Sequence, residues 1–184
     1  MRDDRDPIEG ERSAEPTHRP GLERLWADWR SDYVSHPDTG RTDRGCVICR
    51  IIEATDDAEA LVLERTELTI AVMNLYPYGS GHLMVAPMRH VPSFVDLTDE
   101  ENGALAHAQV RALRAINEAY APDGANCGAN LGRAAGAGVP GHLHMHVLPR
   151  WSGDTNFMTA VGEVRVLPES LRAGYDKLKA AWPR

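Results

Sequence analysis

The feature that most constrains how this chain can fold is a run of alternating imidazole and apolar side chains, His142-Leu-His144-Met-His146-Val-Leu148, followed by Pro149. Successive side chains of a β-strand point to opposite faces of a sheet. The run therefore predicts a strand from His142 to Pro149, with three histidines on one face and an apolar face in the core. Alternate strand residues lie roughly 6–7 Å apart, so the three rings could contact successive atoms of one extended ligand, or a metal could contact some of them.

Imidazole is suited to nucleophilic chemistry near neutral pH. Its unperturbed pKa of about 6.5 leaves much of the ring neutral, with one nitrogen free as a nucleophile or a base. A backbone carbonyl can hold the other N–H and fix the tautomer, and the free nitrogen can carry a phosphoryl or nucleotidyl group between two displacements. Two other interpretations remain open at this point: a strand that carries three histidines by chance, and a hydrolytic zinc site built on His-x-His.

Apolar segments before and after the long helical region have the length and composition of strands. The additional predicted strands are Ala60–Leu63, Leu68–Met73, His82–Pro87 and Ala125–Leu131.

Two segments have the period of a helix instead. Thr98 and Glu101 form a capping box at the start of the first, which runs to about Tyr120 with an apolar face of Leu105, Ala108, Ala112, Leu113 and Ile116. The second begins at Pro168, a favourable residue for a first turn. Strands that follow one another, with the helices separate, predict an α+β domain: an antiparallel sheet of about five strands with a long helix and a C-terminal helix.

The chain divides into a tail and one domain. Residues 1–20 are charged and aperiodic, which predicts a disordered N-terminal tail, and residues 21–184 are expected to form a single domain with its core at 45–157. Trp26 and Trp29 are the first residues that need burial.

Charge limits the class of partner. Lys and Arg total 20 against 27 Asp and Glu, and the net charge of −7 argues against general nucleic-acid binding, which needs a basic surface. No apolar run is long enough to span a bilayer and no signal peptide is recognisable, so we expect a cytoplasmic protein without a membrane partner. We expect no organic cofactor.

Three cysteines are too few for a disulfide framework. The pair in Cys46-Val-Ile-Cys49 could be metal ligands, a redox pair or two buried thiols. A redox pair of the thioredoxin kind belongs after a parallel strand, and no βαβ pattern is present. Cys127 stands alone in a predicted strand and is expected in the core.

The run of histidines resembles the signature of the histidine-triad (HIT) superfamily, in which three histidines alternate with apolar residues and two more apolar residues follow. The similarity extends from Cys46 to Asn156 and includes Asn74-Leu-Tyr-Pro-Tyr-Gly-Ser-Gly-His82 and Asn130-Leu-Gly-Arg-Ala-Ala-Gly136. Within the superfamily, the segments 25–30 and 149–157 look most like the actinobacterial diadenosine tetraphosphate phosphorylase-like branch. The resemblance implies a HIT-like fold and an enzyme that cleaves dinucleoside polyphosphates.

The resemblance also implies a role for individual residues. His144 would be the nucleophile that forms a nucleotidyl-histidine, and His146 would contact phosphate oxygens. Asn74 would hold the ribose of a purine nucleotide, unless it serves only as a turn residue. Asn130 would lie near the phosphates, unless it caps a strand. The residues expected to contact the base are Val47, Ile48 and Ile51.

One departure from the family concerns the substrate. Relatives often carry Ser or Thr shortly before the first histidine, whereas residues 136–141 here contain no hydroxyl. Backbone N–H groups of this glycine-rich turn could replace it. Phosphorolysis by inorganic phosphate and hydrolysis by water therefore both stay open. Two other functions also stay open: a purine nucleoside phosphoramidase, and a nucleotide-binding module with little turnover.

Several bacterial members of the superfamily carry a structural zinc, and the resemblance implies the ligands Cys46, Cys49, His90 and His142. Four such ligands fill a tetrahedral site and leave no open position, which makes the metal structural rather than catalytic. His144 and His146 would then remain available for phosphate chemistry. Family members are usually homodimers, so a homodimer is expected here.

Overall fold

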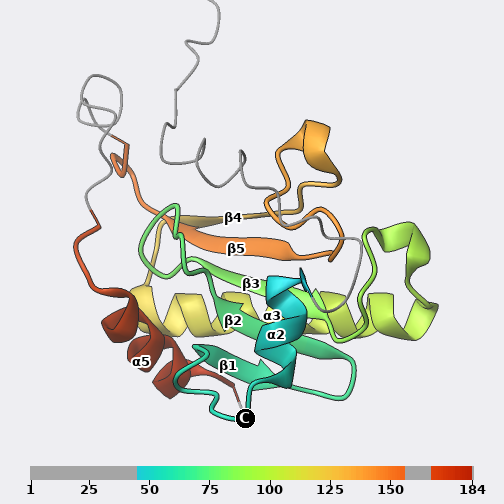
Figure 1. The fold of residues 1–184 in the computed structure, drawn as a ribbon. Helices are drawn as coiled ribbons and strands as arrows, with labels where there is room; N and C mark the ends of the chain where they lie inside the picture. Colours follow the sequence, from blue (N-terminus) through green and yellow to red (C-terminus); the bar gives the residue numbers. More distant parts are fainter. Residues whose placement is uncertain (1–44, 156–166, 184) are drawn as a thin grey trace, which may run out of the picture.

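A computed structural model describes residues 45–155 and 167–183 of the chain (Figure 1). Its centre is a five-stranded sheet in the order β1-β2-β3-β5-β4, in which every neighbouring pair is antiparallel. The strands are β1 (Val62–Arg65), β2 (Thr69–Met73), β3 (Leu83–Pro87), β4 (Gly124–Gly128) and β5 (Met145–Arg150). The predicted α+β class and antiparallel sheet are confirmed.

Helices cover both faces of the sheet. The long helix α3 and the C-terminal helix α5 pack on one face, and the short helix α2 packs on the other (Figure 1). The strand β2 is buried along its whole length because Ala71 and Met73 face α3 while Ile70 and Val72 face α2. The helices and 3₁₀ turns are α2 (Val47–Glu53), η2 (Phe94–Asp96), α3 (Asp99–Tyr120), η3 (Arg133–Ala135) and α5 (Leu171–Ala181).

The start of α3 is the capping box expected from the sequence. The Thr98 hydroxyl accepts from the Glu101 N–H, and the Glu101 carboxylate accepts from the Thr98 N–H at 2.8 Å. Arg89, which follows β3, donates two hydrogen bonds to the same carboxylate at 2.8 and 2.6 Å. Glu101 is only 7% exposed, so one buried acid joins the helix to the sheet.

The strand that carries the histidines begins later than predicted. β5 starts at Met145, so His142 and His144 precede it and only His146 lies within the ladder. The Leu143 N–H donates to the Val91 carbonyl at 2.6 Å and not to a neighbouring strand. This bond to the segment after β3 replaces the ladder, and the three histidines therefore do not share one regular strand face.

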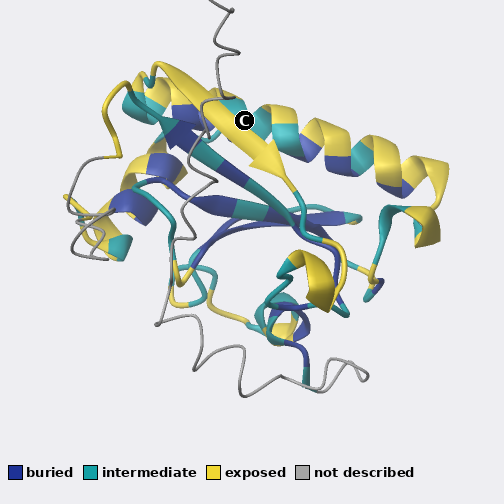
Figure 2. Cartoon of the chain, turned by 90° about the horizontal axis from the view of Figure 1, so that it is seen from above, coloured by how far each residue is buried: buried dark blue, intermediate teal, exposed yellow. Residues whose placement is uncertain are grey.

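The edge strand β4 is exposed along all five residues, as Figure 2 shows. Cys127 lies on this strand and is exposed, so its predicted place in the core is wrong. Among the described residues the strand pairs with β5 alone, and its small residues Gly124, Ala125 and Gly128 offer little apolar surface to a covering element.

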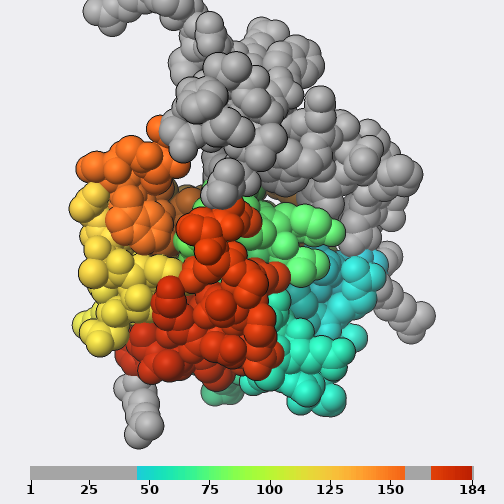
Figure 3. Space-filling model, turned by 90° about the vertical axis from the view of Figure 1, so that its left-hand side faces the viewer, coloured from blue at the N-terminus to red at the C-terminus, as the bar shows by residue number. Residues whose placement is uncertain are grey.

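The helix α5 lies against the C-terminal part of α3 and against β1 (Figure 3). It begins at Leu171 with Ser170 as the N-cap, three residues later than the predicted start at Pro168. Lys179 donates to the carbonyls of Val62 and Leu63, which lie at the outer edge of the sheet. The Lys179 ammonium of α5 therefore satisfies two carbonyls at the edge of β1.

Several predictions lie outside the described residues. These are the tail at 1–20, Trp26 and Trp29, the first part of the domain up to residue 44, and Asn156 and Phe157 at the end of the motif region. None of the helices in the described part of the chain is both long and apolar enough to cross a membrane.

The ion pair at the start of α3 predicts an acid-sensitive contribution to stability. Arg89 holds the pKa of Glu101 at about 2, below its ordinary value of 4.5. The stabilisation is therefore fully present above about pH 4.5 and is lost as the pH falls toward about 2. Glu101→Gln should lower the free energy of unfolding at neutral pH, and its difference from wild type should shrink on acidification, as measured by chemical denaturation.

Glu100→Gln is the matched control, because it removes an exposed charge from the same helical turn without touching Arg89. A difference between Glu101→Gln and wild type that stayed constant down to about pH 2 would contradict this role of the ion pair.

Candidate functional site

The candidate site lies on the face of the sheet that α2 covers. Asn74 directly follows β2 and its N–H donates to the carbonyl of His82, which directly precedes β3. Met84 is paired with His146 in the neighbouring strand. Because alternate residues share a face, this register brings the side chains of Asn74, His82 and His146 to one side of the sheet.

His144 is held in a single tautomer. Its Nδ1 lies 2.8 Å from the carbonyl oxygen of His142, and because a carbonyl can only accept, Nδ1 carries the proton. His144 is 5% exposed, and burial lowers its pKa, while the hydrogen bond to His142 opposes that shift. The ring is therefore neutral near pH 7, with the lone pair on Nε2.

His146 is held in the opposite tautomer by a chain of hydrogen bonds. The Tyr78 N–H donates to Nδ1 of His82 at 2.9 Å, so neutral His82 carries its proton on Nε2. That Nε2 lies 2.9 Å from Nδ1 of His146 and donates to it. His146 must then carry its own proton on Nε2. The rings of His144 and His146 meet edge to face, with centroids 5.1 Å apart.

His82 is the site residue that sequence reasoning missed, since it was assigned only as the start of a strand. It is fully buried. Gly81 before it has φ +71°, and a Cβ there would lie 2.7 Å from the Tyr120 ring, so only glycine fits. Burial and a positive φ are properties of the fold, so the sequence alone offered no signal for the role of His82.

Asn74 and Asn130 occupy different places in the site. The Asn74 Oδ1 accepts from the Tyr76 N–H at 3.0 Å, as a turn residue does, and its Nδ2 faces Nδ1 of His82 at 3.3 Å. The side chain thus supports the histidine chain as well as the loop. Asn130 lies two residues beyond Gly128, which pairs with His146. Asn130 therefore lies just beyond the last paired residue of β4, and His144 lies just before the first residue of β5.

The three residues predicted for a base pocket lie on α2 but differ in burial. Ile48 is 1% exposed and packs with Val62 and Val72, so its side chain is part of the core. Val47 and Ile51 are partly exposed. Of these three residues, only Val47 and Ile51 therefore offer apolar surface to a ligand.

The four predicted metal ligands come together in one cluster. The candidate ligand atoms of Cys46, Cys49, His90 and His142 all lie within 4.8 Å of one another. His142 donates from Nε2 to the Pro87 carbonyl at 2.9 Å, so its Nδ1 has no proton and faces both sulfurs at 3.5 Å. Lone pairs that converge in this way need a shared proton or a cation between them.

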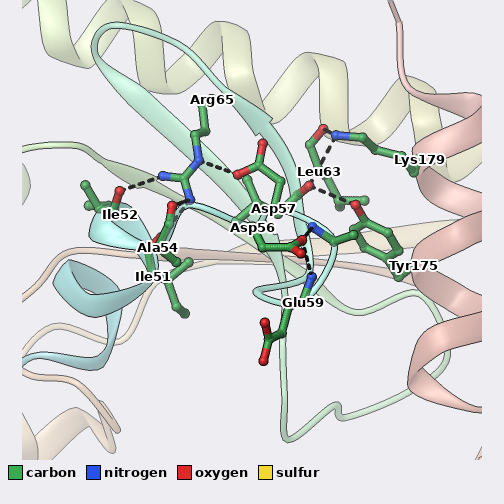
Figure 4. Close-up of polar contacts among 12 residues, drawn as sticks. Ile51, Ile52, Ala54, Asp56, Asp57, Glu59, Leu63, Arg65, Tyr175 and Lys179 are labelled. Atoms are coloured by element: carbon green, nitrogen blue, oxygen red, sulfur yellow. Dashed lines mark hydrogen bonds and ion pairs between the residues drawn. The ribbon is translucent and has the colours of Figure 1, made fainter.

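Arg65 fixes the helix that carries two of these ligands. Its guanidinium donates to the carbonyls of Ile51, Ile52 and Ala54 at the end of α2 (Figure 4). These carbonyls lie at the C-terminal end of the helix and carry its negative partial charge, and the Ile51 carbonyl also accepts from the Ala54 N–H at 3.2 Å. One side chain from β1 therefore anchors the seven-residue helix to the sheet.

The glycine-rich turn before His142 uses part of its backbone internally. The Gly136 N–H donates to the Arg133 carbonyl, and the Ala137 N–H donates to the Gly132 carbonyl at 3.2 Å. These two groups close the turn around η3. They are not directed at an anion.

Comparisons with known proteins agree with this geometry. A family model described as "HIT domain" matches residues 55–153. A protein named AP-4-A phosphorylase from Mycobacterium tuberculosis is 41% identical over 170 residues, which cover 90% of this chain and 87% of that protein. A bis(5'-nucleosyl)-tetraphosphatase from Schizosaccharomyces pombe is 37% identical over 93 residues, 50% of each chain. The crystal structure of a Zn-bound histidine triad family protein from Mycobacterium smegmatis superposes with a TM-score of 0.62 at 28% identity, covering 76% of this chain and 94% of that one.

The histidine chain predicts that His82 sets the tautomer of His146. His82→Leu should leave His146 as a mixture of tautomers, seen as averaged ¹⁵N shifts of its ring nitrogens, while His144 keeps its proton on Nδ1. His82→Gln should preserve the His146 tautomer, because an amide can accept from Tyr78 and donate to His146. His107→Ala, on the exposed side of α3, is the control. A single Nε2–H tautomer of His146 in His82→Leu would contradict the assignment.

Proposed function

Because the chain belongs to the HIT domain family, we propose that it is a nucleotidyl hydrolase or transferase that cleaves dinucleoside polyphosphates of the diadenosine tetraphosphate type. The AP-4-A phosphorylase relative, aligned over 90% of this chain, supports the substrate class. One observation carries the chemistry: a buried lone pair on His144 stands beside an N–H donor on His146.

In the first step Nε2 of His144 attacks the α-phosphorus in line. A P–N bond forms, the P–O bond to the leaving nucleoside polyphosphate breaks, and the nucleotide is held as a nucleotidyl-histidine. The Nε2–H of His146 donates to a phosphate oxygen where negative charge develops. Asn130, which follows the last paired residue of β4, contacts the same phosphate in this proposal.

In the second step water or inorganic phosphate attacks the same phosphorus and the P–N bond breaks. His144 leaves as a neutral imidazole because its Nδ1–H stays with the His142 carbonyl. Water yields a nucleoside monophosphate and releases a proton to solvent, whereas phosphate yields a nucleoside diphosphate. The purine nucleoside is bound by Asn74, Val47 and Ile51, and Ile48 supports this surface from the core.

The donor set of Cys46, Cys49, His90 and His142 fits a structural zinc. Two cysteine sulfurs and two imidazoles within 4.8 Å of one another match the ligand types and number of a tetrahedral zinc site, and Nδ1 of His142 faces the two sulfurs as a ligand atom would. When bound, the ion would cross-link α2, the segment after β3 and the residues before β5. It would supply no open position for substrate.

The exposed edge of β4 supports a homodimer in which this edge pairs with a second copy. A cytoplasmic location stays a prediction from the sequence.

The covalent step is tested with diadenosine tetraphosphate. We expect wild type to gain the mass of one nucleotidyl group on His144, and His144→Ala to lose the adduct and on the order of 10³-fold or more in rate. His107→Ala should match wild type.

ADP formed only with added phosphate would identify a phosphorylase, and AMP formed without added phosphate would identify a hydrolase. Faster cleavage of a nucleoside phosphoramidate, or binding without turnover, would overturn the proposed substrate.

The metal site is tested by stoichiometry. Under reducing conditions the protein should bind about one Zn²⁺ per chain, and Co²⁺ in its place should give the visible bands of tetrahedral thiolate coordination. Cys49→Ser should lose both, while Cys127→Ser, which changes the exposed third cysteine, should retain them. Stoichiometric binding by Cys49→Ser would refute this ligand set.

A further inference from the structure

His142 belongs to two sites at once. Its ring is part of the Cys–His cluster (Cys46, Cys49, His90 and His142), and its main-chain carbonyl accepts the hydrogen bond from Nδ1 of His144. We propose that the cluster is a positioning element for catalysis: with its four ligands joined, it holds the His142 carbonyl in place and thereby keeps the lone pair of His144 on Nε2. The reaction in question is the proposed function, on which this inference rests.

The His142 ring is fixed at both nitrogens. Nε2 donates to the Pro87 carbonyl at 2.9 Å, and Nδ1 faces Cys46 and Cys49, each at 3.5 Å. The residue is 1% exposed, so solvent cannot replace either contact. The direction of the ring, and with it the position of the Cα and the carbonyl, is therefore set by the β3 backbone and by the two sulfurs.

The sheet does not provide this restraint. His142 lies three residues before Met145, where β5 begins, so its carbonyl accepts no ladder hydrogen bond. Its own N–H donates to the Val139 carbonyl within the turn at 3.3 Å. The firm backbone restraint nearby is the bond from the Leu143 N–H to Val91. The contacts of the His142 ring are therefore the second restraint, beside the Leu143–Val91 bond, on the orientation of the peptide group between His142 and Leu143.

The cluster joins segments that are otherwise separate. Cys46 and Cys49 belong to the start of α2, and His90 follows β3, where its Nδ1 lies 3.2 Å from the Cys49 sulfur. A closed set of four ligands has no position for substrate. Its effect on the reaction must therefore pass through geometry, and the His142 carbonyl is the one atom of the cluster residues with a contact to the nucleophile among the described contacts.

The consequence concerns the tautomer of a neutral ring. A histidine without a fixed partner can carry its proton on either nitrogen, and the Nε2–H form of His144 presents no lone pair to phosphorus. Displacement of the His142 carbonyl therefore removes nucleophilic capacity without removing the nucleotide-binding residues Asn74, Val47 and Ile51.

The test uses His90→Ala in the full-length protein. This substitution removes one ligand atom and an edge-to-face ring contact with His142, but it leaves the hydrogen-bonding groups of His142, Pro87 and His144 unaltered. We expect loss of the bound Zn²⁺, averaged ¹⁵N shifts for the two His144 ring nitrogens, and formation of the nucleotidyl-enzyme slowed about 10–100-fold. The affinity for AMP should change by less than about threefold, since the binding residues are unaltered. His90→Cys, which restores a zinc ligand, should restore the metal, the tautomer and the rate.

Cys127→Ser is the matched control and should behave as wild type in every measurement. Circular dichroism and the unfolding midpoint establish that His90→Ala is folded, and wild type freed of zinc with a chelator provides the same comparison without a substitution. A folded, zinc-free protein that keeps His144 protonated on Nδ1 and reacts at the wild-type rate would overturn the proposal. Absence of any adduct in wild type would refute the proposed function instead, and the ¹⁵N shifts would still decide the role of the cluster.

Discussion

The central strands of the sheet must be covered on both faces, and the rest of the structure follows from this constraint. Every residue of β2 is buried, so α3 and α5 have to cover one face and α2 the other. Because α2 is only seven residues long, it leaves part of its face for Asn74, His82 and His146. Because the helix is short, part of this sheet face stays available for a polar site. A helix of this length is marginally stable by itself, and Arg65 stabilises it by binding its C-terminal carbonyls.

In this polar site, backbone groups determine which ring nitrogen of each histidine carries the proton. The His142 carbonyl places the proton of His144 on Nδ1, and the Tyr78 N–H determines, through His82, that the proton of His146 lies on Nε2. Two chemically identical rings consequently present different groups, a lone pair on His144 and an N–H donor on His146, and the proposed mechanism uses this difference. Burial lowers the pKa of His144 and so favours the neutral form that this division of roles requires.

The sequence predicted the fold class, the family and the chemistry of the histidine run because these depend on local patterns. Alternation of apolar residues, the Thr98–Glu101 capping box and the spacing of Cys46 and Cys49 are visible in a single chain, and the structure or the family match confirms the fold, the capping box and the family. Helix α2 was not predicted, since seven residues carry too little periodicity, and Cys127 was misplaced because an edge strand has the same local pattern as a buried one.

What only the tertiary structure decided is which atoms meet. The sequence alone determined that three histidines alternate with apolar residues. That period could not reveal that β5 begins at Met145, or that the His142 side chain lies against Cys46 and Cys49. Nor could it identify His82, whose role depends on a contact with a residue 64 positions away. Hydrogen bonds and side-chain clusters between distant segments are set by packing and strand register, and for that reason the tautomer of His146, which is fixed through His82, belongs to the fold and not to the motif.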